Sequence, residues 1–193
     1  SRYLFMAMHR ARFAATTIAE LRGVVDADGG APFWDGIAGR FFGIGFAEAD
    51  AFNAANGTHV LADMMPRTPV LLAMLDARAR DVVGVPHPSG CPAMRLLEKE
   101  GFRHDRHIDL FDGGPTMTAA TDRIETLRRA RTASVCAIAA TGGAPVIVAS
   151  GRLAAFRCCF GTGAPHGDGI AIDPAAAAAL GVATGDILTY SPR

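Results

Sequence analysis

Hydrophobic residues along the first two thirds of the chain alternate between helical spacing and short runs typical of strands. Proline at the first turn of a helical stretch and glycine just past its last turn mark where helices begin and end. The helices expected on this basis cover residues 2–15, 32–43, 46–56, 68–81 and 91–102. The expected strands cover residues 17–26, 82–85 and 106–114. Residues 58–66 fit either a strand or an irregular segment.

The last third of the chain has shorter hydrophobic runs. Residues 122–131 fit a polar helix or connector, and residues 134–164 hold apolar runs broken by glycines, a pattern of short antiparallel strands. An alanine-rich helix, a glycine stop and a final strand follow in residues 173–190. We therefore expect an α/β (α+β) domain around one sheet over residues 1–125 and a small, mostly β subdomain over residues 126–193.

Composition and charge narrow the range of partners. The 193 residues suffice for one substantial domain or two small ones. The 19 basic and 19 acidic residues cancel, so charge gives no reason to expect a nucleic acid or a membrane surface as partner. No hydrophobic stretch is long enough to span a bilayer. Small molecules or another copy of a similar fold are the expected partners.

Motifs for several kinds of chemistry are missing from the sequence. The four cysteines form no CxxC pair, and no His/Cys spacing resembles a zinc site, so no metal is expected. We expect reduced, buried thiols, which fits the cytoplasm. The glycine-rich residues 161–169 lack the GxxxxGK[ST] pattern and fit a β-turn rather than a phosphate loop. GxSxG and HExxH motifs, which would indicate hydrolases, are absent.

His87 lies between two prolines, just ahead of the helix expected over residues 91–102. Pro88 favours extended geometry at His87, and Pro86 fixes its own φ immediately before it. An imidazole titrates near about 6.5, and a helix start presents N–H groups and positive dipole charge to the same space. This combination suits a proton donor beside a developing anion, although the dipole also favours the neutral ring. A structural histidine with satisfied hydrogen bonds is the alternative.

Four charged residues are candidates for contacts with a substrate. Glu48 and Asp50 follow an aromatic run, and Asp112 lies near the end of a predicted strand. Carboxylates near an aromatic surface suit a cationic substrate, and Arg67 suits a carboxylate. The alternatives are a solvated helix face for Glu48 and Asp50, a turn cap for Asp112 and a solvated loop for Arg67.

Five motifs together point to a known family. They are RGVVDADGGAPFWDGIAGRFF, FAEAD, LADMMPRTPV, VGVPHPSGCPAMRLLEKEGF and DLFDGGPT. In this order they resemble the arginine N-succinyltransferases, bacterial enzymes of arginine catabolism, up to about residue 130. A motif such as LLEKEGF is shared more widely, among acyl-CoA N-acyltransferases of the GNAT superfamily.

The resemblance implies a GNAT-like mixed sheet flanked by helices and transfer of succinyl from succinyl-CoA to the α-amino group of arginine. It places the family's catalytic histidine, a proton donor, at His87. We expect His87 to protonate the departing CoA thiolate while backbone N–H groups hold the oxyanion. Succinyl-CoA is then a co-substrate, and no permanently bound cofactor is expected.

Departures from the family pattern leave alternatives open. Family members usually carry Gln-Thr after the His-Pro pair, where this chain has Ser89–Gly90, and His where it has Thr68. Ornithine is therefore an alternative acceptor, and a non-catalytic partner subunit of a heteromeric acyltransferase is an alternative to an enzyme. The family's main CoA loop precedes the matching residues. We therefore expect an oligomer with an N-terminal portion of the same enzyme or with a paralogous subunit.

Overall fold

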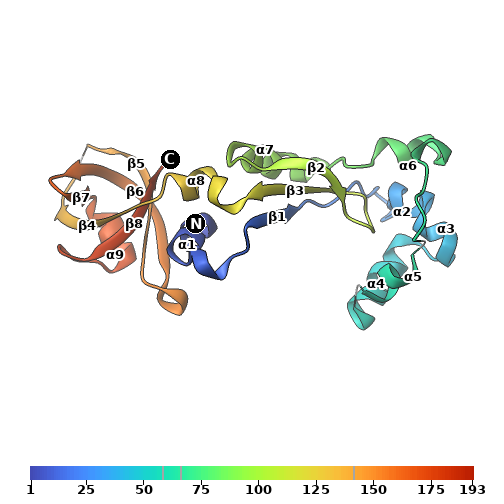
Figure 1. The fold of residues 1–193 in the computed structure, drawn as a ribbon, viewed down its shortest axis with the longest axis horizontal. Coiled ribbons are helices and arrows are strands. Elements are labelled where there is room, and N and C mark those ends of the chain that lie inside the picture. The colour runs from blue at the N-terminus through green and yellow to red at the C-terminus, as the bar shows by residue number, and fades with distance from the viewer. Residues whose placement is uncertain (58, 66, 141) are drawn as a thin grey trace. The chain divides into compact units, whose positions relative to one another are not determined.

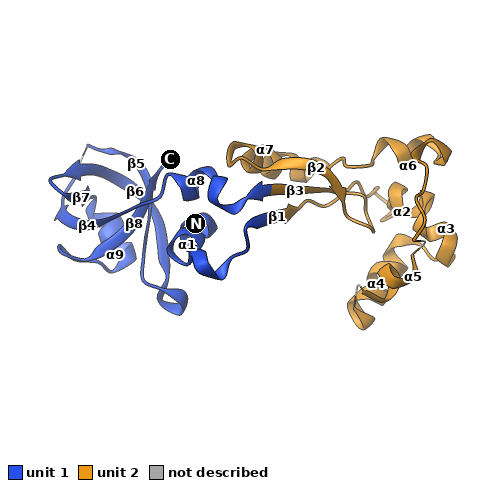
Figure 2. Ribbon diagram, viewed as in Figure 1, with its two compact units in different colours: residues 1–17, 119–193 blue, residues 18–118 orange. Residues whose placement is uncertain are grey.

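Helices and sheets combine in an α+β fold (Figure 1). The residues that the computed structural model describes are 1–57, 59–65, 67–140 and 142–193. Contacts divide the chain into two compact units, coloured separately in Figure 2. Unit 1 consists of residues 1–17 and 119–193, and unit 2 consists of residues 18–118.

The helices and strands are as follows in the two units. The helices of unit 1 are α1 (Arg2–Met8), α8 (Glu125–Arg128) and α9 (Pro174–Leu180). The helices of unit 2 are α2 (Pro32–Gly36), α3 (Ala38–Phe42), α4 (Phe46–Asn56), α5 (His59–Met64), α6 (Ala77–Asp81) and α7 (Cys91–Lys99). A three-stranded sheet in the order β1-β3-β2 comprises β1 (Thr16–Glu20), β3 (Pro115–Ala120) and β2 (Arg103–Ile108). The remaining strands are β4 (Arg131–Ile138), β5 (Ala144–Ser150), β6 (Arg157–His166), β7 (Gly169–Ile172) and β8 (Ile187–Pro192).

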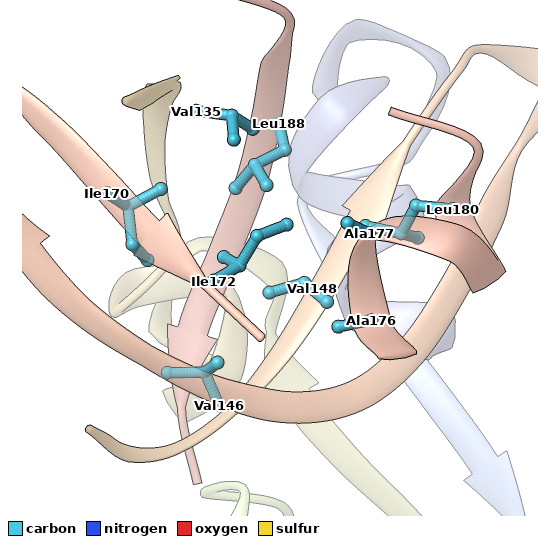
Figure 3. Close-up of a cluster of buried hydrophobic side chains, with 9 residues drawn as sticks. All are labelled: Val135, Val146, Val148, Ile170, Ile172, Ala176, Ala177, Leu180 and Leu188. Atoms are coloured by element: carbon cyan, nitrogen blue, oxygen red, sulfur yellow. The ribbon is translucent and has the colours of Figure 1, made fainter. Parts of the chain in front are cut away.

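Strands β4 to β8 close into a barrel in the order β4-β7-β6-β5-β8. The β4–β7 pair is parallel, whereas the other neighbouring pairs are antiparallel. Alternate residues of a strand share one face, so closing the ring gathers the apolar ones in one interior. Figure 3 shows this core, which consists of Val135, Val146, Val148, Ile170, Ile172, Ala176, Ala177, Leu180 and Leu188.

Residues at both ends of α9 explain why the helix forms and where it attaches. Asp173 is its N-cap, because the Oδ1 atom accepts a hydrogen bond from the Ala176 N–H at 2.8 Å. The Oδ2 atom accepts another from the Thr162 N–H on β6 at 2.6 Å. These bonds, first that from Thr162 and then that from Ala176, hold the pKa of Asp173 below its usual range. Gly181 ends the helix at φ 70°, a conformation that favours glycine.

We expect Asp173→Ala to lower the free energy of unfolding by about 1–2 kcal/mol at neutral pH, because the substitution removes a helix cap and a strand contact together. The folded-state pKa is lowered, so the carboxylate stabilises the fold above the unfolded-state pKa. This contribution is lost as the pH falls through the folded-state pKa. Urea unfolding followed by circular dichroism should therefore show a gap between wild type and variant that narrows in acid.

Asp173→Asn is the matched control for this prediction, since asparagine keeps the cap without the charge. It should destabilise the protein less than Asp173→Ala at neutral pH. A gap between wild type and Asp173→Ala that stayed equal at every pH would contradict the role of the charge.

Trp34 lies at the centre of the helical part of unit 2, where it is fully buried. Its ring stacks on Phe42 and on Phe111, with centroid distances of 5.9 and 5.7 Å. Its Nε1–H donates a hydrogen bond to the Ile44 carbonyl at 3.0 Å. One side chain therefore connects α2, α3 and the turn that follows β2.

Several predicted helices are confirmed. The structure has α4 over the predicted residues 46–56, and the helix predicted over 91–102 is α7, which ends shortly before Gly101 at φ 92°. The helix predicted over 32–43 is present as α2 and α3, with an interruption at Ile37. The alanine-rich helix and the final strand of the tail are also confirmed, as α9 and β8.

Other predictions for unit 2 are wrong. The strand alternative for residues 58–66 is wrong at 59–64, which form α5, while residues 58 and 66 lie outside the described residues. The helix predicted over 68–81 is reduced to a 3₁₀ turn at Leu72–Met74 and to α6, because the Asp76 side chain caps a new helix there.

The strands around the centre of the chain also differ from the prediction. Residues 82–85 form no strand, and Gly84 turns the chain at φ 71°. The strand predicted over 106–114 ends at Ile108 as β2, and β3 begins at Pro115 after a tight turn. The sequence reasoning missed β3 because Gly113 and Gly114 gave a signal for the turn alone.

Candidate functional site

His87 lies where segments of unit 2 that are distant in sequence run side by side. Its N–H donates a hydrogen bond to the Arg22 carbonyl at 2.7 Å, and the preceding Pro86 pairs with Gly23 in an isolated β-bridge. The turn before β3 joins them through hydrogen bonds to Gly23 and Gly84. We call the three segments the His87 junction, and they are residues 22–23, 84–87 and 112–114.

Asp112 fastens the turn before β3 to the rest of the His87 junction. One carboxylate oxygen accepts a hydrogen bond from the Gly23 N–H and the other from the Gly114 N–H, both at 2.8 Å. A Cβ atom on Gly23 would lie 2.1 Å from the Asp112 carbonyl oxygen, and one on Gly114 would lie 2.1 Å from the Leu21 carbonyl oxygen. Backbones this close require glycine, so the junction has little freedom to move. Asp112 thus caps a turn, and its contact with a substrate stays a prediction.

Ser89 contacts one of the two ring nitrogens of His87. The Ser89 N–H donates to Nδ1 at 3.2 Å, and the Ser89 hydroxyl oxygen lies 2.7 Å from the same atom. The Nε2 atom has no hydrogen bond to any described residue, and the side chain is partly exposed. The extended geometry predicted for His87 is confirmed, with ψ at 142°. A free, accessible ring nitrogen is suited to proton transfer.

The chain enters a helical segment directly after His87, as the sequence predicts. Pro88–Gly90 is a 3₁₀ turn, and the Gly90 N–H donates to the His87 carbonyl at 2.7 Å. The turn continues into α7, which has Pro92 in its first turn. The imidazole therefore lies at the start of a helical segment, where the backbone dipoles favour negative charge.

The other predicted site residues lie elsewhere in unit 2. Glu48 and Asp50 are exposed on α4, and Arg67 is exposed after α5. Among the described residues, no hydrogen bond or ion pair joins these three side chains to His87 or to one another. Their roles as substrate contacts stay predictions.

Unit 2 also contains a charged cavity of about 360 Å³ that the sequence reasoning missed. The residues that line it are Asp26, Pro32, Asp35, Gly36, Arg40, Asp76, Ala77 and Arg78. Arg40 lies 3.0 Å from Asp76 and Arg78 lies 3.9 Å from Asp26, so four of these charges are paired. No motif links the segments that supply them, which is why no sequence signal pointed to this cavity.

Thiols and metals add no further group to the site. The four cysteines are free and partly exposed, so the expectation that they are buried is wrong. Partial burial nevertheless raises the pKa of the Cys158 and Cys159 thiols, which keeps them protonated near neutral pH. Within the described ranges, no group of three or more His, Cys, Asp or Glu residues could hold a metal ion. None of the helices described is long and apolar enough to cross a membrane.

Comparison with known families assigns a class to this fold and site. The family described as "Arginine N-succinyltransferase beta subunit" matches residues 1–126, and the description of its C-terminal domain matches residues 128–192. The chain therefore belongs to the arginine N-succinyltransferase beta subunit family. The resemblance carried by the five sequence motifs is confirmed.

Individual relatives agree with this assignment. Proteins named "Arginine N-succinyltransferase" from Escherichia coli O1:K1 / APEC and from Enterobacter sp. (strain 638) are 42% and 41% identical over 135 residues. These residues make up 70% of this chain and 39% of each relative. A solved structure, "The structure of arginine/ornithine succinyltransferase subunit AI from Pseudomonas aeruginosa", matches with a TM-score of 0.83 and 31% identity. The match covers 99% of this chain and 55% of that chain.

Proposed function

We propose that this chain belongs to an arginine N-succinyltransferase and supplies the acceptor and proton-donor half of its site. The observation that carries the proposal is a partly exposed His87 with a free Nε2 atom, held at a rigid junction, in a chain of this family. The mixture of helices and a three-stranded sheet supports the GNAT-like fold for residues 1–125. The start of the barrel at Arg131 supports a separate subdomain over residues 126–193.

The proposed reaction is acyl transfer from a thioester to an amine. The α-amino nitrogen of the acceptor attacks the thioester carbonyl carbon of succinyl-CoA, and the tetrahedral oxyanion is held by backbone N–H groups. The C–S bond then breaks, and the departing sulfur takes a proton from the Nε2 atom of His87. The nitrogen releases its extra proton to solvent, and solvent returns a proton to the ring. The products are the succinylated amine and the free CoA thiol.

The proposed acceptor is arginine, with ornithine as the alternative, since the related Pseudomonas aeruginosa protein is named for both. Both molecules carry a cationic side chain and an α-carboxylate. We propose Glu48 and Asp50 as partners of the cation and Arg67 as the partner of the carboxylate, because all three are exposed and unpaired among the described residues. Asp112 is a weaker candidate, because backbone N–H groups already occupy both of its oxygens.

The CoA pyrophosphate is proposed to bind to a partner segment. This segment is an N-terminal portion of the same enzyme or a paralogous subunit in an oligomer, and the greater length of the relatives supports it. Succinyl-CoA is the co-substrate, and no permanently bound cofactor is proposed. The proposed location is the cytoplasm. A non-catalytic subunit is the alternative, favoured by the departures at Ser89, Gly90 and Thr68.

Thiol release from succinyl-CoA tests the proposal, using the protein purified with any polypeptide that accompanies it. We expect release that depends on arginine, and intact-mass spectrometry should identify the accompanying polypeptide. Faster release with ornithine would assign ornithine as the acceptor. Release that needs no amine would contradict amine acylation, and no release with either amine would leave the non-catalytic subunit as the better description.

A further inference from the structure

Ser89 holds one edge of the His87 ring through two different atoms. We propose that Ser89 is a positioning residue, which orients His87 so that Nε2 is the nitrogen that carries and delivers the proton. The kinetic consequence of this inference rests on the proposed function. The assignment of the ring nitrogens rests on the geometry at Ser89 alone.

The Ser89 backbone determines which nitrogen of the neutral ring carries hydrogen. A backbone N–H can only donate, and that of Ser89 donates to Nδ1 at 3.2 Å. The neutral ring must therefore present its lone pair at Nδ1, which places its single hydrogen on Nε2. The Ser89 hydroxyl, 2.7 Å from Nδ1, donates to the same lone pair.

The Ser89 hydroxyl also suits the protonated ring. A hydroxyl can donate or accept, so it can turn to accept the hydrogen that the imidazolium carries at Nδ1. Ser89 therefore stays a partner of Nδ1 before and after a proton leaves Nε2. Since no described residue bonds to Nε2, that atom is left for the substrate.

The surrounding backbone makes this contact selective for ring orientation. The His87 N–H is bound to the Arg22 carbonyl and its carbonyl accepts from the Gly90 N–H, both at 2.7 Å. These bonds fix the main chain on either side of the ring, so the side-chain torsions are the freedom that remains. Ser89, two residues further along, removes that freedom.

Ser89→Ala and Ser89→Thr provide a matched pair, because alanine removes the hydroxyl and threonine keeps it. Two-bond ¹H–¹⁵N spectra of the histidine rings, recorded where the rings are neutral, report which nitrogen carries hydrogen. His87→Asn identifies the His87 signals by their loss. We expect the Nε2–H form in wild type and in Ser89→Thr, and a larger share of the Nδ1–H form in Ser89→Ala.

The kinetic readout of the same variants is kcat against KM for succinyl transfer. Ser89→Ala should lower kcat about 5- to 10-fold, the equivalent of one lost hydrogen bond, with KM unchanged, and Ser89→Thr should restore it. An Nδ1–H ring in wild type, an unchanged ring spectrum in Ser89→Ala or a wild-type kcat in that variant would each overturn the inference. If wild type transferred no succinyl group, the proposed function would fail while the ring spectra still decided the assignment of the nitrogens.

Discussion

His87→Ala should lower kcat for succinyl transfer by about 10²- to 10⁴-fold, the range attributed to a positioned general acid or base. The alanine removes the Nε2 atom proposed to protonate the CoA thiolate. KM should change little, because the free Nε2 atom is proposed to act on the leaving group rather than to bind the acceptor. The measurement is CoA thiol release from succinyl-CoA at saturating arginine.

Two control variants separate loss of the proton from loss of structure. Asparagine is a preferred N-cap residue, so His87→Asn keeps an acceptor for the Ser89 N–H while removing the proton donor. It should lose activity like His87→Ala and retain the wild-type circular dichroism spectrum. His166→Asn, at an exposed residue of the barrel unit, should keep full activity. Full succinyl transfer by either His87 variant would refute the assignment.

Trp34→Ala should lower the free energy of unfolding by about 3–5 kcal/mol, the usual cost of removing a buried aromatic side chain. The substitution leaves a cavity between Phe42 and Phe111 and leaves the Ile44 carbonyl without its donor. Urea unfolding followed by circular dichroism measures the change. Trp34 is the only tryptophan, so its fluorescence in the wild type follows the same core directly.

Phe41→Ala is the matched control for this substitution, because Phe41 lies on α3 and is 61% exposed. It should change stability by no more than about 0.5 kcal/mol. Trp34→Phe should fall between the two, since it keeps an aromatic ring and loses the Nε1–H bond. A cost below about 1 kcal/mol for Trp34→Ala would contradict the central place of this ring.

The helices that sequence could predict are those whose ends carry local signals. Proline in the first turn and glycine after the last gave α7 and α9 near their observed bounds. Such signals depend only on the chain's own backbone, so tertiary contacts do not alter them. The segment over 68–81 failed because its apolar spacing suggested one helix, whereas the Asp76 side chain begins a new one.

The strand partners could not be predicted, because pairing depends on residues far apart in sequence. The tail strands were expected to be antiparallel, and the parallel β4–β7 pair closes the ring instead. Likewise, β3 lies between β1 and β2 in its sheet although no hydrophobic run marked it in advance.

The candidate site was predictable only in part. The two prolines around His87 gave its extended backbone, since their effect is local. The contacts of Asp112 with Gly23 and Gly114 depend on the crossing of distant segments, and the capping alternative for Asp112 was the nearest that sequence came to them. Ser89 stood out as a departure from the family pattern, but its bond to Nδ1 required coordinates.

The closed ring of β4 to β8 bears on how the protein behaves at high concentration. Each of these strands, over its described residues, has a hydrogen-bonded neighbour on both sides. Unpaired strand edges recruit strands from other molecules and seed aggregates, and a ring offers none. Fibrils that form from the folded state are therefore expected to begin outside this ring, and the apolar sequences of β5 and β7 become a hazard only after it opens.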